Sequence, residues 1–312
     1  MIPAEQIAGV LNPRPRGKRY MALFRFFCDE SYDSDPNKGH RNVRSKAKTV
    51  YVPKTYVVAG FLANEFVWGK IEKPWLEKNK EYGVSRFHAA YVNARDGEFA
   101  GWSKPHRDSY VLSLLGMLQE QGRYLHAISV GMYPKDYEKI INPHGRRLFG
   151  TPYIACFKTC VVLIAHEMEL VGLPREDKFA VIFDRNEFES DAVKIFYALK
   201  DNPAFPLRHR LATCAPGGWE EFVPLQCADM IAYDTHRLLE DKNVGMERTR
   251  KSLESLYSKN GFMGFYFEQD LLRSFKEPLE NAKGVDNGFI VTPRPLCNLE
   301  QYETFRKAFE LP

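Results

Sequence analysis

Three aspartates stand where apolar patterns end or are interrupted, which is an unusual place for a carboxylate. Asp29 lies near the end of the strand-like segment 20–30, Asp184 follows the apolar run FAVIF, and Asp229 borders the buried face of the helical pattern LQCADMIAYDTHRLL. A carboxylate held away from water is costly without a partner. Each acid therefore requires a basic side chain, hydrogen-bond donors or a metal ion beside it.

The three acids could meet at one edge of a sheet. If the strands at 20–30 and 179–183 run parallel, Asp29 and Asp184 lie at the edge where ligands gather in open α/β sheets, and a helix could bring Asp229 there. Three converging carboxylates repel one another unless a divalent cation neutralises them, and oxygen ligands favour Mg²⁺ or Mn²⁺ over zinc. This predicts metal-assisted hydrolysis of a phosphodiester. Spacing alone also allows the interpretation that they are strand ends and a salt-bridged helix acid.

The elements around these acids alternate between strands and helices. Apolar runs predict strands at 20–30, 55–62, 124–133, 179–183 and 207–214. Helical spacing predicts helices at 65–80, 107–121 and 153–170, a helix through 199 opened by the capping pair Asn186 and Glu189, and one at 225–239 after Pro224. Hairpin-like strands followed by alternating strands and helices predict a mixed α/β sheet flanked by helices.

Three segments make up the predicted organisation of the 312 residues. We interpret 1–19 as a basic N-terminal arm and 20–242 as the α/β domain, with a basic insertion after its first strand. Residues 243–312 form a C-terminal extension that is helical and then loop-like. A chain of this length allows two domains or one elaborated domain.

Composition excludes several classes of protein. With 44% apolar and 27% charged residues, the chain is typical of a globular protein rather than a disordered or collagen-like one. The longest clearly apolar stretch, CVVLIA at 160–165, is far short of the ~20 residues that cross a bilayer, and the N-terminus lacks an apolar signal segment. The six cysteines form no CxxC pair and are interpreted as reduced core residues. We therefore expect a cytoplasmic protein with no membrane partner.

Charge is concentrated locally rather than in the whole chain. The balance of 44 Lys and Arg against 40 Asp and Glu gives only +4, which does not by itself indicate a nucleic-acid partner. A basic segment nevertheless follows directly after Asp29, with the cations Lys38, Arg41, Arg44, Lys46, Lys48 and Lys54. Beside an acid cluster these side chains could bind substrate phosphates, although a solvated charged segment is an equally simple interpretation.

Four motifs, in order, carry a resemblance to a known family. They are CDES at 28–31, RFHAAYVNARDGEFAGW at 86–102, VIFDRNE at 181–187 and PLQCADMIAYDTHR at 224–237. This set resembles the bacterial and phage family catalogued as domain of unknown function 3800, over residues 20–239. The resemblance implies a ribonuclease H-like fold and a nuclease activity. It also implies that Asp29, Asp184 and Asp229 are the metal ligands, from the first strand, a later strand and a C-terminal helix.

Further residues within these motifs are candidates for the site. Glu30 also matches the family's DES, but neighbours in a strand face opposite ways, so we favour Asp29 as the ligand and keep Glu30 as a ligand or a supporting acid. His88 could bind phosphate, move a proton or contact the metal, and a structural histidine is the alternative. Gln226, three residues before Asp229 on the helix, could orient that acid or touch the substrate.

The leading hypothesis is a Mg²⁺- or Mn²⁺-dependent phosphodiesterase that acts on nucleic acid. A catalytically silent module that binds nucleic acid or a protein on the same fold is the alternative from a different class. Hydrolysis of a small phosphate ester is a third possibility. The sequence contains no GxxxxGK[ST], GxGxxG or GxSxG motif, so it does not indicate a nucleotide-cofactor site or a serine hydrolase.

Overall fold

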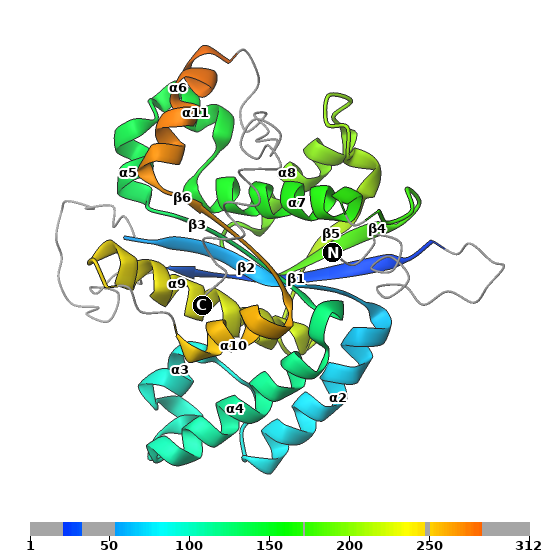
Figure 1. Cartoon of the computed structure of the whole chain (residues 1–312), viewed down its shortest axis with the longest axis vertical. Coiled ribbons are helices and arrows are strands. Elements are labelled where there is room, and N and C mark those ends of the chain that lie inside the picture. Colours follow the sequence, from blue (N-terminus) through cyan, green and yellow to red (C-terminus); the bar gives the residue numbers. More distant parts are fainter. Residues whose placement is uncertain (1–20, 33–53, 171, 247–249, 283–312) are drawn as a thin grey trace.

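The computed structural model describes residues 21–32, 54–170, 172–246 and 250–282, and its centre is a six-stranded sheet (Figure 1). The strands are β1 (Leu23–Tyr32), β2 (Tyr56–Asn64), β3 (His126–Met132), β4 (Lys178–Asp184), β5 (Leu211–Gly217) and β6 (Gly261–Phe267). In space they follow the order β5-β4-β1-β2-β3-β6. Among these six strands β2 alone runs antiparallel to its neighbours, because the pairs β1/β4, β4/β5 and β3/β6 are parallel. The predicted mixed sheet is confirmed, and β1 and β4 run parallel, the condition on which the meeting of Asp29 and Asp184 depended.

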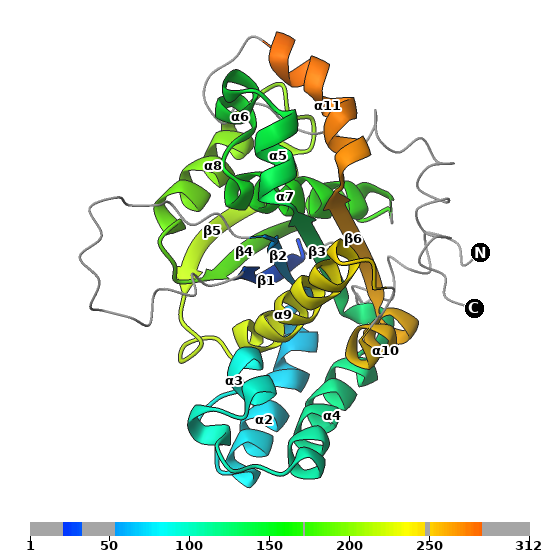
Figure 2. The same ribbon diagram turned by 90° about the vertical axis from the view of Figure 1, so that its left-hand side faces the viewer.

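Helices cover both faces of this sheet. They are α2 (Glu65–Glu81), α3 (Ala89–Ala94), α4 (Lys104–Glu120), α5 (Pro134–Ile140), α6 (Pro143–Phe149), α7 (Pro152–Leu170), α8 (Glu189–Asp201), α9 (Pro224–Asn243), α10 (Lys251–Lys259) and α11 (Gln269–Asn281). In Figure 1, α7 and α8 lie above the sheet with α5, α6 and α11, whereas α9 lies below it with α2, α3, α4 and α10. Figure 2 shows α9 running across the strands from the opposite side to α7.

Alternation along β1 divides the core between the two helical layers. Phe24, Phe26 and Cys28 pack in the cluster that contains the buried side chains of α7, whereas Phe27 packs in the cluster that contains those of α9. Helix α7 is apolar on nearly every side because it is buried along most of its length. Each large apolar side chain fully buried in this way contributes about 1.5–3 kcal/mol to stability. The two clusters together hold the strands that carry the acids.

Two predicted boundaries differ from the structure. Helix α8 begins at Glu189, after Phe188, and Asn186 does not cap it. The side chain of Asn186 instead accepts a hydrogen bond from the backbone N–H of Phe188 and donates one to Glu30. The segment after residue 243 is not purely helical and loop-like, because Gly261–Phe267 forms β6 and pairs in parallel with β3 at the sheet edge. The C-terminal residues to 282 therefore extend the same sheet and helical layers.

No single helix in the described part of the chain is long and apolar enough to cross a membrane. Helices α6 and α7 reach that length and composition only when they are joined across a break at which they bend by 44°. Most of α7 is buried, with 14 side chains inside the protein, as in the core helix of a globular domain.

Candidate active site

One open pocket brings together residues from four separate segments of the chain. Its lining consists of Asp29, Arg86, Phe87, His88, Asp184, Trp219, Leu225, Gln226 and Asp229. The pocket lies at the carboxyl ends of β1 and β4, on the face that α9 covers. All three aspartates singled out in the sequence are in this lining, although more than 40 residues separate any two of them.

Parallel pairing places the first two acids side by side. The last paired residues of β1 and β4 are Cys28 and Phe183, so Asp29 and Asp184 follow them at equivalent positions. Side chains alternate along a strand, and both acids therefore share the face of Phe27 and Ile182, which pack toward α9. The sheet itself thus brings two carboxylates to one place.

Helix α9 supplies the third acid, which is held by the start of α3. Oδ2 of Asp229 accepts a 2.7 Å hydrogen bond from the backbone N–H of Ala89. The same oxygen lies 3.4 Å from Nδ1 of His88, with 20% of the Asp229 side chain and 32% of the His88 side chain exposed. The His88 ring also packs on Tyr91, with 4.4 Å between the ring centroids. His88 is therefore a pocket residue in contact with an acid.

Burial and the charges of neighbouring acids raise the pKa values of Asp29 and Asp184. Burial raises the pKa of Asp29 well above its ordinary value, and the charges of Glu30, Asp229 and Asp184 raise it further. Burial also raises the pKa of Asp184, while the backbone N–H of Arg185 lowers it and Asp229 raises it again. A cation placed among these oxygens would reverse this repulsion and favour the ionised forms.

The donor set fits a hard divalent cation by its chemistry. Three carboxylates at one pocket supply the oxygen ligands that Mg²⁺ and Mn²⁺ prefer, and they are the groups whose repulsion such an ion relieves. Oδ1 of Asp29 and Oδ2 of Asp229 each accept a hydrogen bond from a backbone N–H, of Glu30 and of Ala89 respectively. Within residues 21–32 and 54–282, apart from 171 and 247–249, no three His, Cys, Asp or Glu side chains are arranged as a ready metal-binding group.

Glu30 lies outside the pocket lining. It follows Asp29 in β1 and accepts a 2.7 Å hydrogen bond from Nδ2 of Asn186. Burial raises the pKa of Tyr56 and Tyr153, and the charge of Glu30 adds to the rise; both tyrosines belong to the cluster on the α7 side of the sheet. Burial raises the pKa of Glu30 itself to about 7. Strand alternation thus turns Glu30 away from the pocket lining, although its charge still acts on Asp29.

Gln226 lines the pocket, but its side-chain carbonyl oxygen accepts hydrogen bonds from groups inside the protein. Its Oε1 accepts hydrogen bonds from Nε1 of Trp75, Nδ2 of Asn79 and the backbone N–H of Phe87, at 2.9–3.1 Å. Oδ1 of Asn79 in turn accepts from the Tyr110 hydroxyl at 2.8 Å. These bonds tie α2, α4 and the chain before His88 to α9 one turn from Asp229. These hydrogen bonds position the wall of the pocket. Contact between Gln226 and a substrate stays a prediction.

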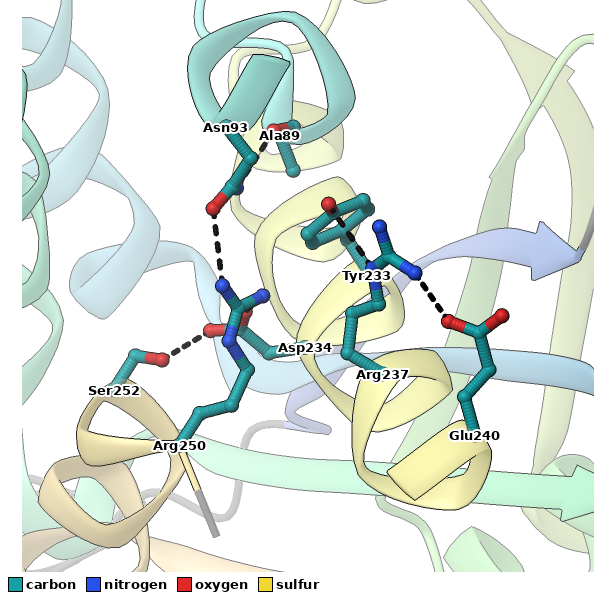
Figure 3. A network of polar contacts seen from close by, with 8 residues as sticks. All are labelled: Ala89, Asn93, Tyr233, Asp234, Arg237, Glu240, Arg250 and Ser252. Atoms are coloured by element: carbon teal, nitrogen blue, oxygen red, sulfur yellow. Dashed lines mark hydrogen bonds and ion pairs between the residues drawn. The ribbon is translucent and has the colours of Figure 1, made fainter. Parts of the chain in front are cut away.

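A second polar network surrounds Ala89, the residue whose backbone N–H binds Asp229 (Figure 3). Nδ2 of Asn93 donates to the carbonyl of Ala89 at 2.8 Å, and Oδ1 of Asn93 accepts from Arg250 at 3.0 Å. Arg250 also pairs with Asp234 at 2.7 Å, and Ser252 donates to the same carboxylate. The network joins α3, α9 and α10, so the amide that binds Asp229 is itself fixed.

Sequence reasoning did not single out two lining residues, Arg86 and Trp219. The guanidinium carbon of Arg86 lies 4.3 Å from the centroid of the Trp219 ring. Arg86 stands two positions before His88 in a motif already identified, which was the available signal. Trp219 follows two glycines in a loop, and nothing in its local pattern indicates a site.

The basic segment after β1 cannot be placed relative to the pocket. Lys38, Arg41, Arg44, Lys46 and Lys48 lie outside the described residues. Their role in binding phosphate therefore stays a prediction.

Comparison of the chain with family models, with curated proteins and with solved structures finds no match. The functional argument consequently rests on the pocket geometry and on the sequence motifs.

Proposed function

We propose that this chain is a divalent-metal-dependent phosphodiesterase that hydrolyses nucleic acid on a ribonuclease H-like fold. One observation carries the proposal: Asp29, Asp184 and Asp229, from β1, β4 and α9, line a single pocket together with His88. These are the elements that the family resemblance implies for the metal ligands. Three partly buried carboxylates at one place, with raised pKa values at two of them, are a costly arrangement that cation binding explains.

Each residue has a separate role in this proposal. Asp29, Asp184 and Asp229 would hold Mg²⁺ or Mn²⁺, and the bound ion would supply an activated water and stabilise charge on the leaving oxygen. His88 takes or gives a proton at the pocket, because an imidazole can do both and its Nδ1 lies 3.4 Å from Oδ2 of Asp229. Gln226 and Ala89 fix the chain around these groups through their hydrogen bonds.

A catalytically silent binding module on the same fold is the second candidate. The observation in its favour is that no three potential ligands among the described residues are arranged as a ready metal-binding group. Such a module would bind nucleic acid or a protein partner through the same face and would not need the aspartates ionised. It predicts that Asp29→Ala leaves binding intact.

The test is hydrolysis of labelled single-stranded DNA, duplex DNA, RNA and RNA–DNA hybrid in Mg²⁺, Mn²⁺ or EDTA. We expect cleavage of at least one substrate that requires the metal and is lost in both Asp29→Ala and Asp229→Ala. Circular dichroism and thermal unfolding check that the variants remain folded. Absence of cleavage by the wild type under every metal, with equal nucleic-acid binding by the variants, would favour the silent module instead.

A further inference from the structure

Two side chains from distant loops meet on the wall of the acid pocket. Arg86 lies between α2 and α3, and Trp219 lies between β5 and α9. The guanidinium carbon stands 4.3 Å from the indole centroid, and both residues belong to the lining with the three aspartates. Burial raises the pKa of Asp184, and the positive charge of Arg86 acts against that rise.

The guanidinium of Arg86 has no other partner among the described residues: none of them forms a hydrogen bond or an ion pair with it. Two other arginines, Arg185 and Arg210, use their donors within the protein. Nη2 of Arg185 contacts both carboxylate oxygens of Glu221, and Arg210 binds Glu169 and three backbone carbonyls. A guanidinium that stacks through its face keeps its N–H donors at its edge. Arg86 therefore presents free donors at the pocket.

A phosphate group matches these donors. Guanidinium binds phosphate oxygens through two parallel N–H bonds, whereas an ammonium acts only as a point charge. The three carboxylates would repel a phosphate that entered alone, so an anionic substrate requires a cation on the facing wall. We propose that the guanidinium of Arg86, held against the indole of Trp219, binds a phosphate of the substrate strand beside the three aspartates. This inference rests on the proposed function and names how its substrate is held.

The loop that carries Trp219 is closely packed at Gly217, which helps to hold the indole in place against Arg86. A Cβ at Gly217 would lie 2.6 Å from the Phe222 ring, and one at Gly218 would lie 2.6 Å from Oε2 of Glu220. The backbone N–H of Gly218 donates to Glu221 at 3.1 Å, and Glu221 pairs with Arg185. Trp219 is a positioning residue in this account, because it acts on the substrate only through Arg86.

The test separates binding from cleavage. Fluorescence anisotropy measures the dissociation constants of fluorescein-labelled single-stranded DNA and RNA of equal length in EDTA, where no hydrolysis occurs. Cleavage of the same strands is then followed in Mn²⁺. The variants are Arg86→Met, Arg86→Lys, Trp219→Leu and Trp219→Phe. Arg273→Met, on α11 in the opposite helical layer, removes the same charge away from the pocket and is the control.

We expect Arg86→Met to weaken binding about tenfold and to reduce the slope of log affinity against log salt by about one. Trp219→Leu should weaken binding less, and Trp219→Phe should restore most of it, because an aromatic face is what orients the guanidinium. Arg86→Lys should recover only part of the affinity. Arg273→Met should leave affinity within twofold of the wild type.

The outcomes distinguish this inference from the proposed hydrolysis. If the wild type cleaves and Arg86→Met binds and cleaves as Arg273→Met does, the inference is wrong and hydrolysis stands. If the wild type binds but never cleaves, and Arg86→Met binds weakly, the inference stands and hydrolysis is wrong. A wild type that neither binds nor cleaves either strand overturns both. The DNA and RNA arms show which strand supplies the phosphate.

Discussion

The backbone N–H of Ala89 donates a 2.7 Å hydrogen bond to Oδ2 of Asp229, a residue 140 positions further along the chain. This bond fixes the first turn of α3 to α9 at the pocket. Behind it, Asn93 bonds both the carbonyl of Ala89 and the guanidinium of Arg250, which is paired with Asp234 (Figure 3). The position of one acid thus depends on side chains that never reach the pocket.

Removal of Asn93 should therefore weaken both the fold and the site. We expect Asn93→Ala to lower the free energy of unfolding by about 1–2 kcal/mol, because Arg250 and the carbonyl of Ala89 each lose a hydrogen-bond partner. Urea unfolding measures this loss. Asn243→Ala, at the exposed end of α9, is the control and should change it by less than ~0.5 kcal/mol. Equal effects of the two variants would contradict the role of the network.

Gln226 should prove essential to the structure of the pocket wall. In Gln226→Leu, the donors on Trp75, Asn79 and Phe87 lose their shared acceptor inside the protein. We expect the free energy of unfolding to fall by about 3 kcal/mol or more, since each buried donor left unpaired is costly. Urea unfolding checks this against Gln269→Leu, at an exposed position that begins α11. A loss below ~1 kcal/mol would mean that other groups satisfy the donors.

Much of this site could be predicted from local pattern. The apolar run before Asp184 indicated a central strand buried on both faces, and the structure has this strand as β4 between β1 and β5. Strand alternation also separates Asp29 from Glu30, as expected for neighbours in an extended chain. These features depend on periodicity within one element, which the sequence displays directly.

Features that depend on contacts between distant segments could not be predicted in this way. Strand β6 carries Gly261 and Gly264, which weaken a strand pattern, and it is stabilised by pairing with β3 more than 100 residues earlier. Arg86 and Trp219 meet from two loops, and no local period relates them. Asn186 has the residue type of a helix cap, but α8 begins at Glu189, after Phe188, and the Asn186 side chain donates to Glu30.

The buried Lys158 of α7 should give stability a distinct pH dependence. Its side chain is 1% exposed, and burial lowers its pKa from 10.5 to about 7. Between these values the unfolded chain binds the proton that the folded chain has released, so the lysine's destabilising effect is full below pH 7 and fades as pH rises toward 10.5. Lys158→Met should therefore be more stable than the wild type by about 2–4 kcal/mol at pH 7, and this advantage should shrink at higher pH.

Urea unfolding of both proteins at pH 7 and pH 9.5 measures that difference. The ionisation of other groups, such as the buried cysteines, is common to the two proteins and cancels in the comparison. Lys73→Met, whose parent side chain is 84% exposed, should show no such dependence. An advantage of Lys158→Met that is equal at both pH values would show that burial of the charge is not its cause.

Metal ions should stabilise the fold through the three aspartates. A ligand that binds only the folded chain adds about 2.7 kcal/mol when its free concentration is 100-fold above the dissociation constant. We expect Mn²⁺ to raise the Tm by several degrees over EDTA in the wild type and in Asp270→Asn, where the parent side chain is 95% exposed. Asp29→Asn and Asp184→Asn should lose the rise. Differential scanning calorimetry that found the same rise in all four proteins would place the ion elsewhere.

The most direct test of the account is the cleavage rate of Asp229→Asn in Mn²⁺, measured beside the wild type and Asp270→Asn on whichever labelled strand the wild type cuts. The account predicts that Asp270→Asn cuts at the wild-type rate and that Asp229→Asn is about 1,000-fold slower while it remains folded, since a lost ligand removes several kcal/mol of transition-state stabilisation. A folded Asp229→Asn that cuts as fast as the wild type would contradict the claim that these aspartates form a hydrolytic centre.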